Sequence, residues 1–485
     1  MKTALERYCL TAFLVILSAC SSWKEAAEVS DAEPVMFPDY SGVTVPSGIA
    51  PLNFMVEDAG HVQAVFCAGG SEIAEVKGND GIIAVPAKTW KRILSAGADT
   101  SVSVEVSAWS DEHPDGLRYR PFKFNVAEDE IDPWVAYRLI EPGYIGWRQL
   151  GIYQRNLSSF EEVPIVTNRE SNTTCLNCHH FPSHSSESML FHARGAGGGT
   201  ILYDGGVPKK IDFKSIGEGK SATYPAWHPD GRFIAFSSNT THQIFFAEGD
   251  HPIEVFDSAS DLILYDALTS EVLTDPRFNT GLSLETFPAW SADGRYLYFV
   301  SSDNTGLDVK FTPSARYHLL RVSFDPQTRS FGEKVDTLYN AYTRGGSISH
   351  PRLSPDGRYM LYTWSSYGTF PIWHAEADLR MLDLQTMEDV DVSVWNDPDD
   401  ADSYHAWSSN GRWILIGSRR LDGRYTRIYI AHLSEDGIPG KPFLLPQEDP
   451  RHDLWRLKSY NIPEFTDGKV ILPKEAAELF KTQAR

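Results

Sequence analysis

Residues 224–238 read YPAWHPDGRFIAFSS and decide the fold, because the same pattern recurs three more times along the chain. Each copy places an Asp-Gly or Asn-Gly pair between two apolar runs, which predicts a β-hairpin with a tight turn. The glycines of these pairs are 63, 63 and 54 residues apart, at Gly231, Gly294, Gly357 and Gly411. The later copies are FPAWSADGRYLYFVSS (287–302), HPRLSPDGRYMLYTWSS (350–366) and YHAWSSNGRWILIGSRR (404–420).

Further pairs of apolar runs lie between these copies and predict outer hairpins, at residues 261–273, 317–331, 378–392 and 427–445. Two hairpins in each period make one four-stranded sheet, which is the unit of a β-propeller. Another outer hairpin, at 199–213, has no Asp-Gly copy before it, so we expect its sheet to start near Met189. Segments around 134–160 and the C-terminal tail could complete one more sheet. The sequence therefore predicts five or six blades.

The W-x-P-D-G-R core of these repeats resembles that of TolB-like β-propellers, which is also met in the propellers of prolyl oligopeptidase relatives. The resemblance covers residues 186–445, and the third copy departs from it with Leu353 in place of the usual Trp. It implies a propeller over residues 186–450, followed by a tail, 451–485, that could close it. The repeated tryptophans fit blade packing better than ligand binding. They are Trp227, Trp290 and Trp407.

Residues 35–127 predict a separate, smaller all-β domain of the β-sandwich type. One of its segments alternates valines with polar residues, as a half-buried strand does, at Val102, Val104 and Val106. Cys67 lies inside another predicted strand, and we expect it to be a buried structural thiol. Residues 128–185 show little regular pattern, so we expect a linker there between this domain and the propeller.

The first 20 residues, MKTALERYCLTAFLVILSAC, are typical of an export signal. The apolar run 10–17 is shorter than the ~20 residues that a membrane-spanning helix needs. The run ends in Leu-Ser-Ala-Cys, which resembles the bacterial lipobox and implies cleavage before Cys20 and acylation of that residue. Residues 1–19 would then be a signal peptide and 20–34 a polar tether. An ordinary signal peptide with an incidental cysteine is the alternative.

This resemblance also implies a location. Ser21, rather than Asp, follows the cysteine, which favours the outer membrane under the usual sorting rule for lipoproteins. We therefore expect a lipid-anchored protein of the bacterial cell envelope. Its expected partners are the membrane, through the lipid, and a protein that docks on the propeller face.

Charge and cysteine content exclude other classes. The 485 residues hold 44 Lys and Arg against 65 Asp and Glu, a formal net charge of -21. Such a charge repels phosphate backbones, so nucleic acid is not an expected partner. Only 5 cysteines are present, which excludes dense disulfide cross-linking.

The strongest chemical motif is Cys175-Leu-Asn-Cys-His179, which is C-x-x-C-H. In c-type cytochromes two thiols at this spacing attach to the haem, and the histidine binds the iron. We therefore predict one haem c, held covalently by Cys175 and Cys178, with His179 as the proximal iron ligand. His192 or Met189 would be the distal ligand, and an open position is the third option. These two residues point to opposite faces of a predicted strand, so only one of them can serve.

Other interpretations of the motif stay open. A thioredoxin-type pair would precede a helix, but Pro182 and the serines near it do not begin one. A Cys2His2 zinc site would need two more ligands from His180, His184 and His192. A disulfide between Cys175 and Cys178 is the remaining alternative. His228 and His405, within the repeats, are expected to be hydrogen-bonded surface residues.

The arrangement as a whole resembles predicted bacterial lipoproteins that carry one haem c motif before a TolB-like propeller. It implies one-electron transfer, or redox-linked docking of a partner, in the cell envelope. The alternative is a non-redox propeller lipoprotein that binds or scaffolds other molecules, with a structural or zinc-binding motif. An enzyme with an open haem site, such as a peroxidase, is a third hypothesis. The chain has no G-x-S-x-G or H-E-x-x-H motif, so enzymatic activity stays uncertain.

Overall fold

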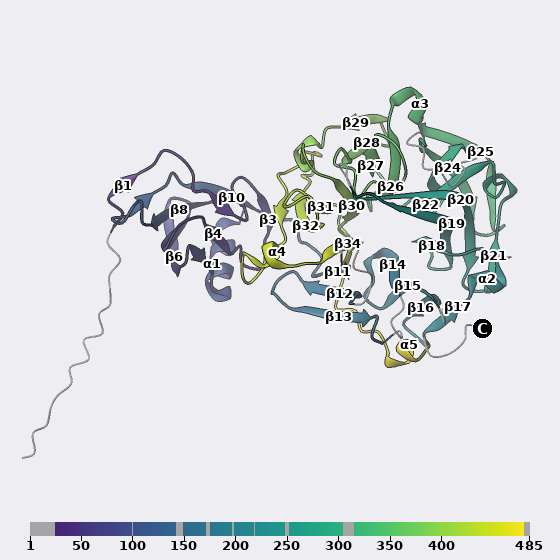
Figure 1. Cartoon of the computed structure of the whole chain (residues 1–485), viewed down its shortest axis with the longest axis horizontal. Helices are drawn as coiled ribbons and strands as arrows, with labels where there is room; N and C mark the ends of the chain where they lie inside the picture. The colour runs from purple at the N-terminus through teal and green to yellow at the C-terminus, as the bar shows by residue number, and fades with distance from the viewer. Residues whose placement is uncertain are drawn as a thin grey trace, which may run out of the picture.

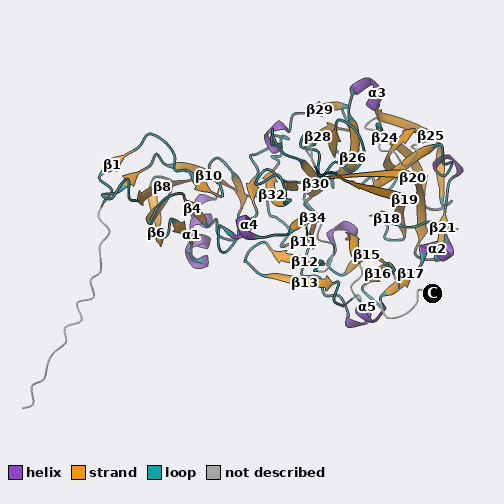
Figure 2. Cartoon of the chain, viewed as in Figure 1, coloured by secondary structure: helices purple, strands orange, loops and turns teal. Residues whose placement is uncertain are grey.

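The chain forms two parts that lie side by side (Figures 1 and 2). A small N-terminal part, purple in Figure 1, contacts a larger ring of sheets that runs from blue to yellow. The computed structural model describes residues 25–98, 100–141, 149–170, 175–195, 198–217, 219–247, 252–303 and 315–479. Cys20 and the predicted signal peptide lie outside the described residues. Within the described ranges, no helix is long and apolar enough to cross a membrane.

The N-terminal part contains a seven-stranded and a three-stranded sheet. The larger sheet comprises β1 (Glu28–Val29), β3 (Thr44–Pro46), β5 (His61–Ala68), β6 (Ser71–Asn79), β8 (Ser101–Trp109), β9 (Leu117–Arg118) and β10 (Phe122–Ala127). The smaller one comprises β2 (Met36–Phe37), β4 (Phe54–Val56) and β7 (Ile82–Ile83). The alternating valines of β8 are fully buried, as predicted. Cys67 lies in β5 and is half-buried rather than buried.

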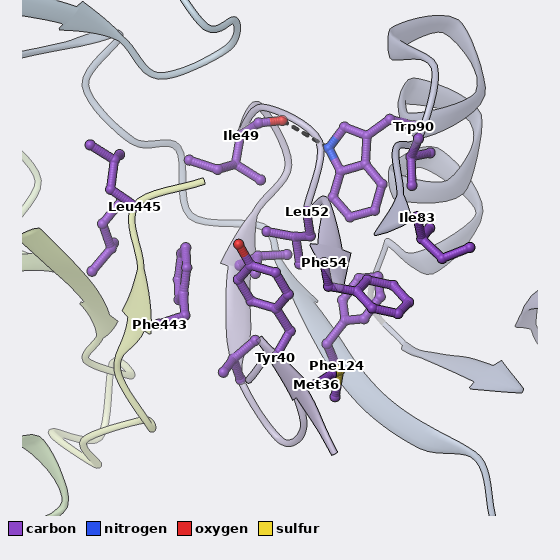
Figure 3. Close-up of a cluster of buried hydrophobic side chains, with 14 of the residues drawn as sticks. Met36, Tyr40, Ile49, Leu52, Phe54, Ile83, Trp90, Phe124, Phe443 and Leu445 are labelled. Atoms are coloured by element: carbon purple, nitrogen blue, oxygen red, sulfur yellow. Dashed lines mark hydrogen bonds between the residues drawn. The ribbon is translucent and has the colours of Figure 1, made fainter. Parts of the chain in front are cut away.

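The helix α1 (Ala87–Gly97) was not predicted from the sequence. It begins after Pro86 and buries Trp90, Ile93 and Leu94, which share one helical face. Figure 3 shows Trp90 above the core, where its indole N–H donates to the backbone oxygen of Ile49 at 2.9 Å. The short run between two strand-rich stretches hid this helical spacing.

The same core continues into the ring. Tyr40 of the N-terminal part faces Phe443 of the ring, with ring centroids 6.5 Å apart (Figure 3). Both residues belong to one buried cluster that also contains Leu445 and Trp413. The two parts are therefore joined by a shared apolar core.

Among the described residues, the ring consists of six four-stranded antiparallel sheets. From the innermost strand outward, the first contains β34 (Ser459–Thr466), β11 (Trp134–Ile140), β12 (Gly151–Asn156) and β13 (Glu162–Thr167). The second contains β14 (Cys175–His180), β15 (Ser188–Arg194), β16 (Gly199–Asp204) and β17 (Lys209–Ile211). The third contains β18 (Thr223–Trp227), β19 (Phe233–Phe245), β20 (Ile253–Asp266) and β21 (Glu271–Leu273).

The fourth sheet contains β22 (Ser283–Trp290), β23 (Tyr296–Asp303), β24 (His318–Asp325) and β25 (Ser330–Tyr339). The fifth contains β26 (Ser347–Leu353), β27 (Tyr359–Ser365), β28 (Asp378–Asp383) and β29 (Glu388–Val390). The sixth contains β30 (Asp402–Trp407), β31 (Trp413–Ser418), β32 (Arg427–His432) and β33 (Phe443–Leu444). The short helices of the ring are α2 (Phe213–Ile216), α3 (Ala341–Arg344), α4 (His452–Trp455) and α5 (Lys474–Glu478).

The four sequence repeats form the first two strands of the third to sixth sheets, joined by the predicted tight turns. Gly231 in the first of these turns has a φ of 76°, which glycine adopts without strain. The predicted outer hairpins form the other two strands of each sheet. The fold is therefore mostly β and propeller-like, as the repeats predicted.

Two boundaries differ from the expectation. Residues 128–185, expected to be a linker, supply β11 to β14 and so belong to the ring. The sheet expected to start near Met189 begins at Cys175, because β14 is its innermost strand. The strands β11 to β14 lack the Asp-Gly turn signal, and the repeat pattern in the sequence therefore did not reveal them.

The C-terminal strand closes the ring. β34 pairs antiparallel with β11, which lies more than 300 residues earlier in the chain and opposes Leu139 to Tyr460. Tyr460 is 1% exposed, and its ring meets that of Tyr137 at 4.9 Å. Each innermost strand contacts the next one around the ring, and β34 contacts both β30 and β14. The sheets therefore surround a common channel.

Replacing Tyr460 tests this closure. Tyr460→Ala removes a fully buried ring between β34 and β11, and we expect the free energy of unfolding to fall by about 3–5 kcal/mol. Tyr460→Phe keeps the ring and loses only a 3.4 Å contact with Asp453, so its effect should be small. Urea unfolding followed by tryptophan fluorescence measures both. Equal midpoints for the two variants would contradict this role of the strand.

Candidate functional site

All six innermost strands carry a bulge at the same point, where each pairs with the next strand of its own sheet. The side chains at the bulges line a central cavity and form a collar around it: Cys178, Tyr224, Phe287, His350, Tyr404 and Ile462. All but Tyr404 have φ between 48° and 52°. Such backbone costs about 1–3 kcal/mol per residue and is common at functional sites.

Four rings of this collar lie against one another. The centroids of Tyr224 and Phe287 are 4.2 Å apart, and those of Phe287 and His350 are also 4.2 Å apart. His350 and Tyr404 follow at 5.1 Å. Cys178 and Ile462 complete the collar. The channel is therefore walled by aromatic rings on one side and bordered by a thiol on the other.

The C-x-x-C-H motif occupies the bulge of β14. Cys178 is the collar residue, with a φ of 51°, and the register with β15 shifts between Asn177 and His180. Aligned on the bulge, Asn-Cys-His of β14 corresponds to Thr-Tyr-Pro of β18. The motif therefore lies in a regular strand of the ring, and not in the expected loop-rich linker.

A large cavity opens on the Cys175 side of the collar. Its volume is about 500 Å³, and we call it the vestibule. Cys175, Asn177 and Cys178 form part of its wall. Apolar and aromatic side chains form much of the rest, namely Tyr224, Phe245, Ile253, Val255, Phe370, Ile372, Trp373, Tyr404 and Ile462. The vestibule has the size and the apolar lining of a small-molecule site.

Three arginines line the vestibule: Arg138, Arg194 and Arg419. Within the described part of the chain, none of them forms an ion pair with a carboxylate, whereas many other arginines do. The Nε atoms of Arg138 and Arg419 also have no hydrogen-bond partner. Unpaired guanidinium groups are unusual in a chain with a net charge of -21. Glu141 is the one carboxylate among the described lining residues, so three positive groups face one negative group and the vestibule has an excess of positive charge.

Arg419 is the most constrained of the three. It is 4% exposed, and its guanidinium lies over the ring of Trp373 at 3.2 Å from the centroid. Its Nη1 donates to the backbone oxygen of Arg424 at 2.6 Å. Burial lowers the pKa of Arg419 to about 9, so it remains protonated at neutral pH. This arginine is held in place before any ligand arrives.

His179 faces the channel and does not line the vestibule. It is 2% exposed, and neither ring nitrogen has a hydrogen-bond partner of ordinary geometry. Burial, and then the nearby Arg138, lower the pKa of His179 to about 3, so the imidazole is neutral. The channel cavity that it lines holds only about 40 Å³, room for very few water molecules.

These positions test the predicted haem c. The two thiols fit, because both open on a cavity of suitable size. The predicted proximal ligand does not fit, because His179 points into the small channel cavity, whereas drug-sized groups such as a porphyrin need roughly 300–1,000 Å³. The thiols and the imidazole are therefore not assembled around one haem-sized space, and haem attachment stays a prediction from the sequence.

The candidate distal ligands lie on opposite faces of β15, as predicted. Met189 is fully buried in the apolar core against the first sheet. His192 lies on the other face, with Nδ1 3.3 Å from the hydroxyl of Thr200. Neither lines the channel cavity beside His179. The structure does not bring these residues together with the C-x-x-C-H motif.

The zinc alternative is not assembled either. His180 and His184 line a funnel of about 370 Å³ at the other end of the channel, away from the vestibule. Among the described residues, no group of three or more His, Cys, Asp or Glu side chains could hold a metal ion.

The repeat histidines and tryptophans are structural. His228 and His405 make hydrogen bonds to backbone oxygens, as expected, but both are buried rather than on the surface. The indole N–H groups of the repeated tryptophans donate to backbone oxygens, which supports blade packing. These tryptophans are Trp227, Trp290 and Trp407.

Sequence reasoning missed the vestibule arginines. Arg138 and Arg194 lie in strands that carry no repeat signal, and Arg419 follows the last strand of a repeat. Only the closed ring brings them to one cavity. The one available signal was the alignment of Asn-Cys-His with Thr-Tyr-Pro of the next sheet, which places the motif on the channel.

No protein-family model and no curated protein matches the chain. It is similar to solved structures of peptidases. A puromycin hydrolase matches at 15% identity and a TM-score of 0.38, over 64% of this chain and 45% of that one. A puromycin-hydrolysing peptidase of Mycobacterium tuberculosis matches at 14% and 0.33, over 54% and 38%. Prolyl oligopeptidase B from Galerina marginata matches at 10% and 0.36, over 70% and 42%.

The chain thus spans less than half the length of these enzymes. At such identities and TM-scores the likeness concerns the fold only and transfers no peptidase activity to this chain.

The expected function needs correction. One-electron transfer through haem was predicted, with a non-redox binding or scaffolding module as the alternative. The solved structures to which the chain is similar are hydrolases, and not electron-transfer proteins or scaffolds. Of the three haem-motif residues, only Cys178 lines both cavities in the structure, whereas Cys175 lines the vestibule and His179 the small channel cavity. The C-x-x-C-H spacing is that of a haem c attachment motif, but it does not indicate the secondary structure in which the motif lies.

Glu464 in the funnel gives a test that depends on pH. Its carboxylate accepts a hydrogen bond from the backbone N–H of Phe181 at 3.2 Å, and Arg352 lies 3.8 Å away. Burial raises the pKa of Glu464 to about 7. The folded state therefore holds this proton more tightly than the unfolded chain, and stability is lost as the pH rises from about 4.5 to about 7.

The substitution Glu464→Gln removes this pH-dependent loss of folding stability. Relative to the wild type, the variant should gain stability as the pH rises through that range, by up to about 3 kcal/mol. Urea unfolding at pH 5 and pH 8 measures the difference. Glu161→Gln is a matched control, because its ion pair with Lys469 is half-exposed. A difference between Glu464→Gln and wild type that does not change with pH would contradict the buried carboxyl.

Proposed function

We propose that the chain is a six-bladed propeller that binds an organic anion with an apolar or aromatic body in the vestibule. The observation that carries the proposal is the set of three arginines, Arg138, Arg194 and Arg419, which line the vestibule without carboxylate partners. A ligand with a carboxylate or sulfonate group would form ion pairs with these arginines. The aromatic and aliphatic wall would hold the rest of the ligand.

Energetics favour this class of ligand. Hydrogen bonds between a guanidinium and an anionic oxygen contribute about 1.5–3 kcal/mol each, more than bonds between neutral groups. Arg419 is already held by Trp373 and the backbone, so little side-chain entropy is lost when it binds. Apolar area that leaves water adds about 25 cal/mol per Å².

Asn177 adds a polar contact to the same wall. It is 6% exposed, and its side-chain oxygen has no hydrogen-bond partner among the described residues. A buried acceptor without a partner costs about 1–3 kcal/mol. A ligand with an N–H or O–H group near its anionic end would remove this cost. We therefore expect a ligand with both an anionic group and a nearby donor.

Two fluorescent probes that differ by one group test the proposal. Anilinonaphthalene sulfonate carries an anionic group on an aromatic body, and phenylnaphthylamine is its analogue without the sulfonate. We expect the wild type to bind the sulfonate more tightly. Arg138→Gln and Arg194→Gln should each weaken sulfonate binding by about tenfold or more and leave the neutral probe unchanged.

Arg120→Gln is the matched control, because Arg120 is 61% exposed and lies in the N-terminal part. It should change neither affinity. If the vestibule variants lost affinity for both probes equally, the cause would be damaged folding and not the lost charge. Sulfonate binding that is indifferent to both substitutions would contradict the proposal.

The envelope location and the lipid anchor at Cys20 are proposals that rest on the sequence alone. The predicted tether, residues 20–34, already contains β1 (Glu28–Val29) of the N-terminal part, so its C-terminal half is not a free tether. An anchor at Cys20 would therefore hold the small part nearest to the membrane. The ring with its vestibule is attached through that part.

A further inference from the structure

Cys175 and Cys178 open on the same cavity, although strand geometry alone would separate them. Residues three apart in a regular strand point to opposite faces. The bulge adds one residue to β14 relative to β15 between Asn177 and His180, and this resets the alternation. Both thiols consequently line the vestibule, whereas the next residue, His179, does not.

A disulfide does not suit this pair. Both cysteines are free thiols in the structure. A disulfide needs Cα atoms about 4.4–6.8 Å apart, and the backbone that separates the two cysteines is an extended strand from Cys175 to Asn177, before the bulge at Cys178. Two sulfur atoms on opposite sides of a metal ion, each about 2.3 Å from it, bridge a wider gap than a bond of about 2 Å. The strand thus favours two thiols that share an ion.

The surroundings favour a soft ion of low coordination number. In the described ranges no third His, Cys, Asp or Glu joins the pair in a metal-binding group, so the four ligands of a structural zinc site are missing. Thiolates select soft ions, among which Cu(I) accepts two ligands. We propose that Cys175 and Cys178 bind one Cu(I) ion at the wall of the vestibule.

Two arginines would balance the charge of this site. A Cu(I) ion with two thiolates has a net charge of -1. Arg194 is the direct cross-strand partner of Cys175. Arg138 lies 3.5 Å, through Nη1, from the backbone oxygen of Leu176, between the two cysteines. Neither arginine has a carboxylate partner among the residues described. The positive charge is therefore placed beside the thiols before an ion binds.

Cu(I) titration of the full chain tests the site. Reduced protein, kept free of oxygen, competes for Cu(I) with a colorimetric chelator. We expect Cys175→Ser and Cys178→Ser each to weaken the binding of one equivalent by about 100-fold or more. Cys67→Ser, a free thiol in the N-terminal sheet, and His179→Ala should bind as the wild type does.

A second measurement does not depend on variants. X-ray absorption of the wild-type Cu(I) protein should show two sulfur ligands at a single short distance. Unchanged affinity in both serine variants would overturn the proposal, and so would loss of binding in His179→Ala or a nitrogen ligand in the spectrum. Covalent haem on both cysteines of protein from its own envelope would also overturn it, because thioethers cannot act as thiolates. The probe experiments with the arginine variants fail or succeed independently of these results.

Discussion

The pairing of β34 with β11 closes the ring, and the channel and the vestibule depend on that closure. β34 contributes Ile462 to the collar, Glu464 to the funnel and Asn461 to the vestibule. β11 contributes Arg138, one of the three arginines. These two strands, from opposite ends of the ring, thus supply part of the wall around the motif, and that part is complete only when they meet.

The bulge shared by the innermost strands is the second constraint, because it determines which cavity each residue of the C-x-x-C-H motif lines. A regular strand would direct Cys175 and Cys178 to opposite faces. The extra residue at Cys178 places both thiols on the vestibule wall, with Cys178 also bordering the channel, and directs His179 into the channel. In a haem c site the same three residue types converge on one haem, with the thiols bonded to the porphyrin and the imidazole to the iron. The chemistry of a motif therefore depends on the backbone that presents it, which spacing alone does not reveal.

Local sequence predicted the parts of the fold that local signals control. Asp-Gly turns such as the one at Gly231 fix their hairpins, and alternation at Val102 and Val104 fixes a half-buried strand, because both depend on near neighbours. The innermost strand β14 has no turn signal of its own, and its place depends on the neighbouring sheets. The vestibule could not be predicted from the sequence for the same reason. Arg138, Arg194 and Arg419 come from three sheets and meet only after closure.

The proposed role of the vestibule arginines is to hold an organic anion. Bromobenzoate offers a carboxylate and a heavy atom on one aromatic ring, and anomalous scattering from a crystal soaked with it locates the bromine directly. We predict one bromine peak inside the vestibule, with the carboxylate directed to Arg138, Arg194 or Arg419 and the ring against the aromatic wall. A bromine peak only outside the vestibule, or a carboxylate directed away from all three arginines, would contradict it.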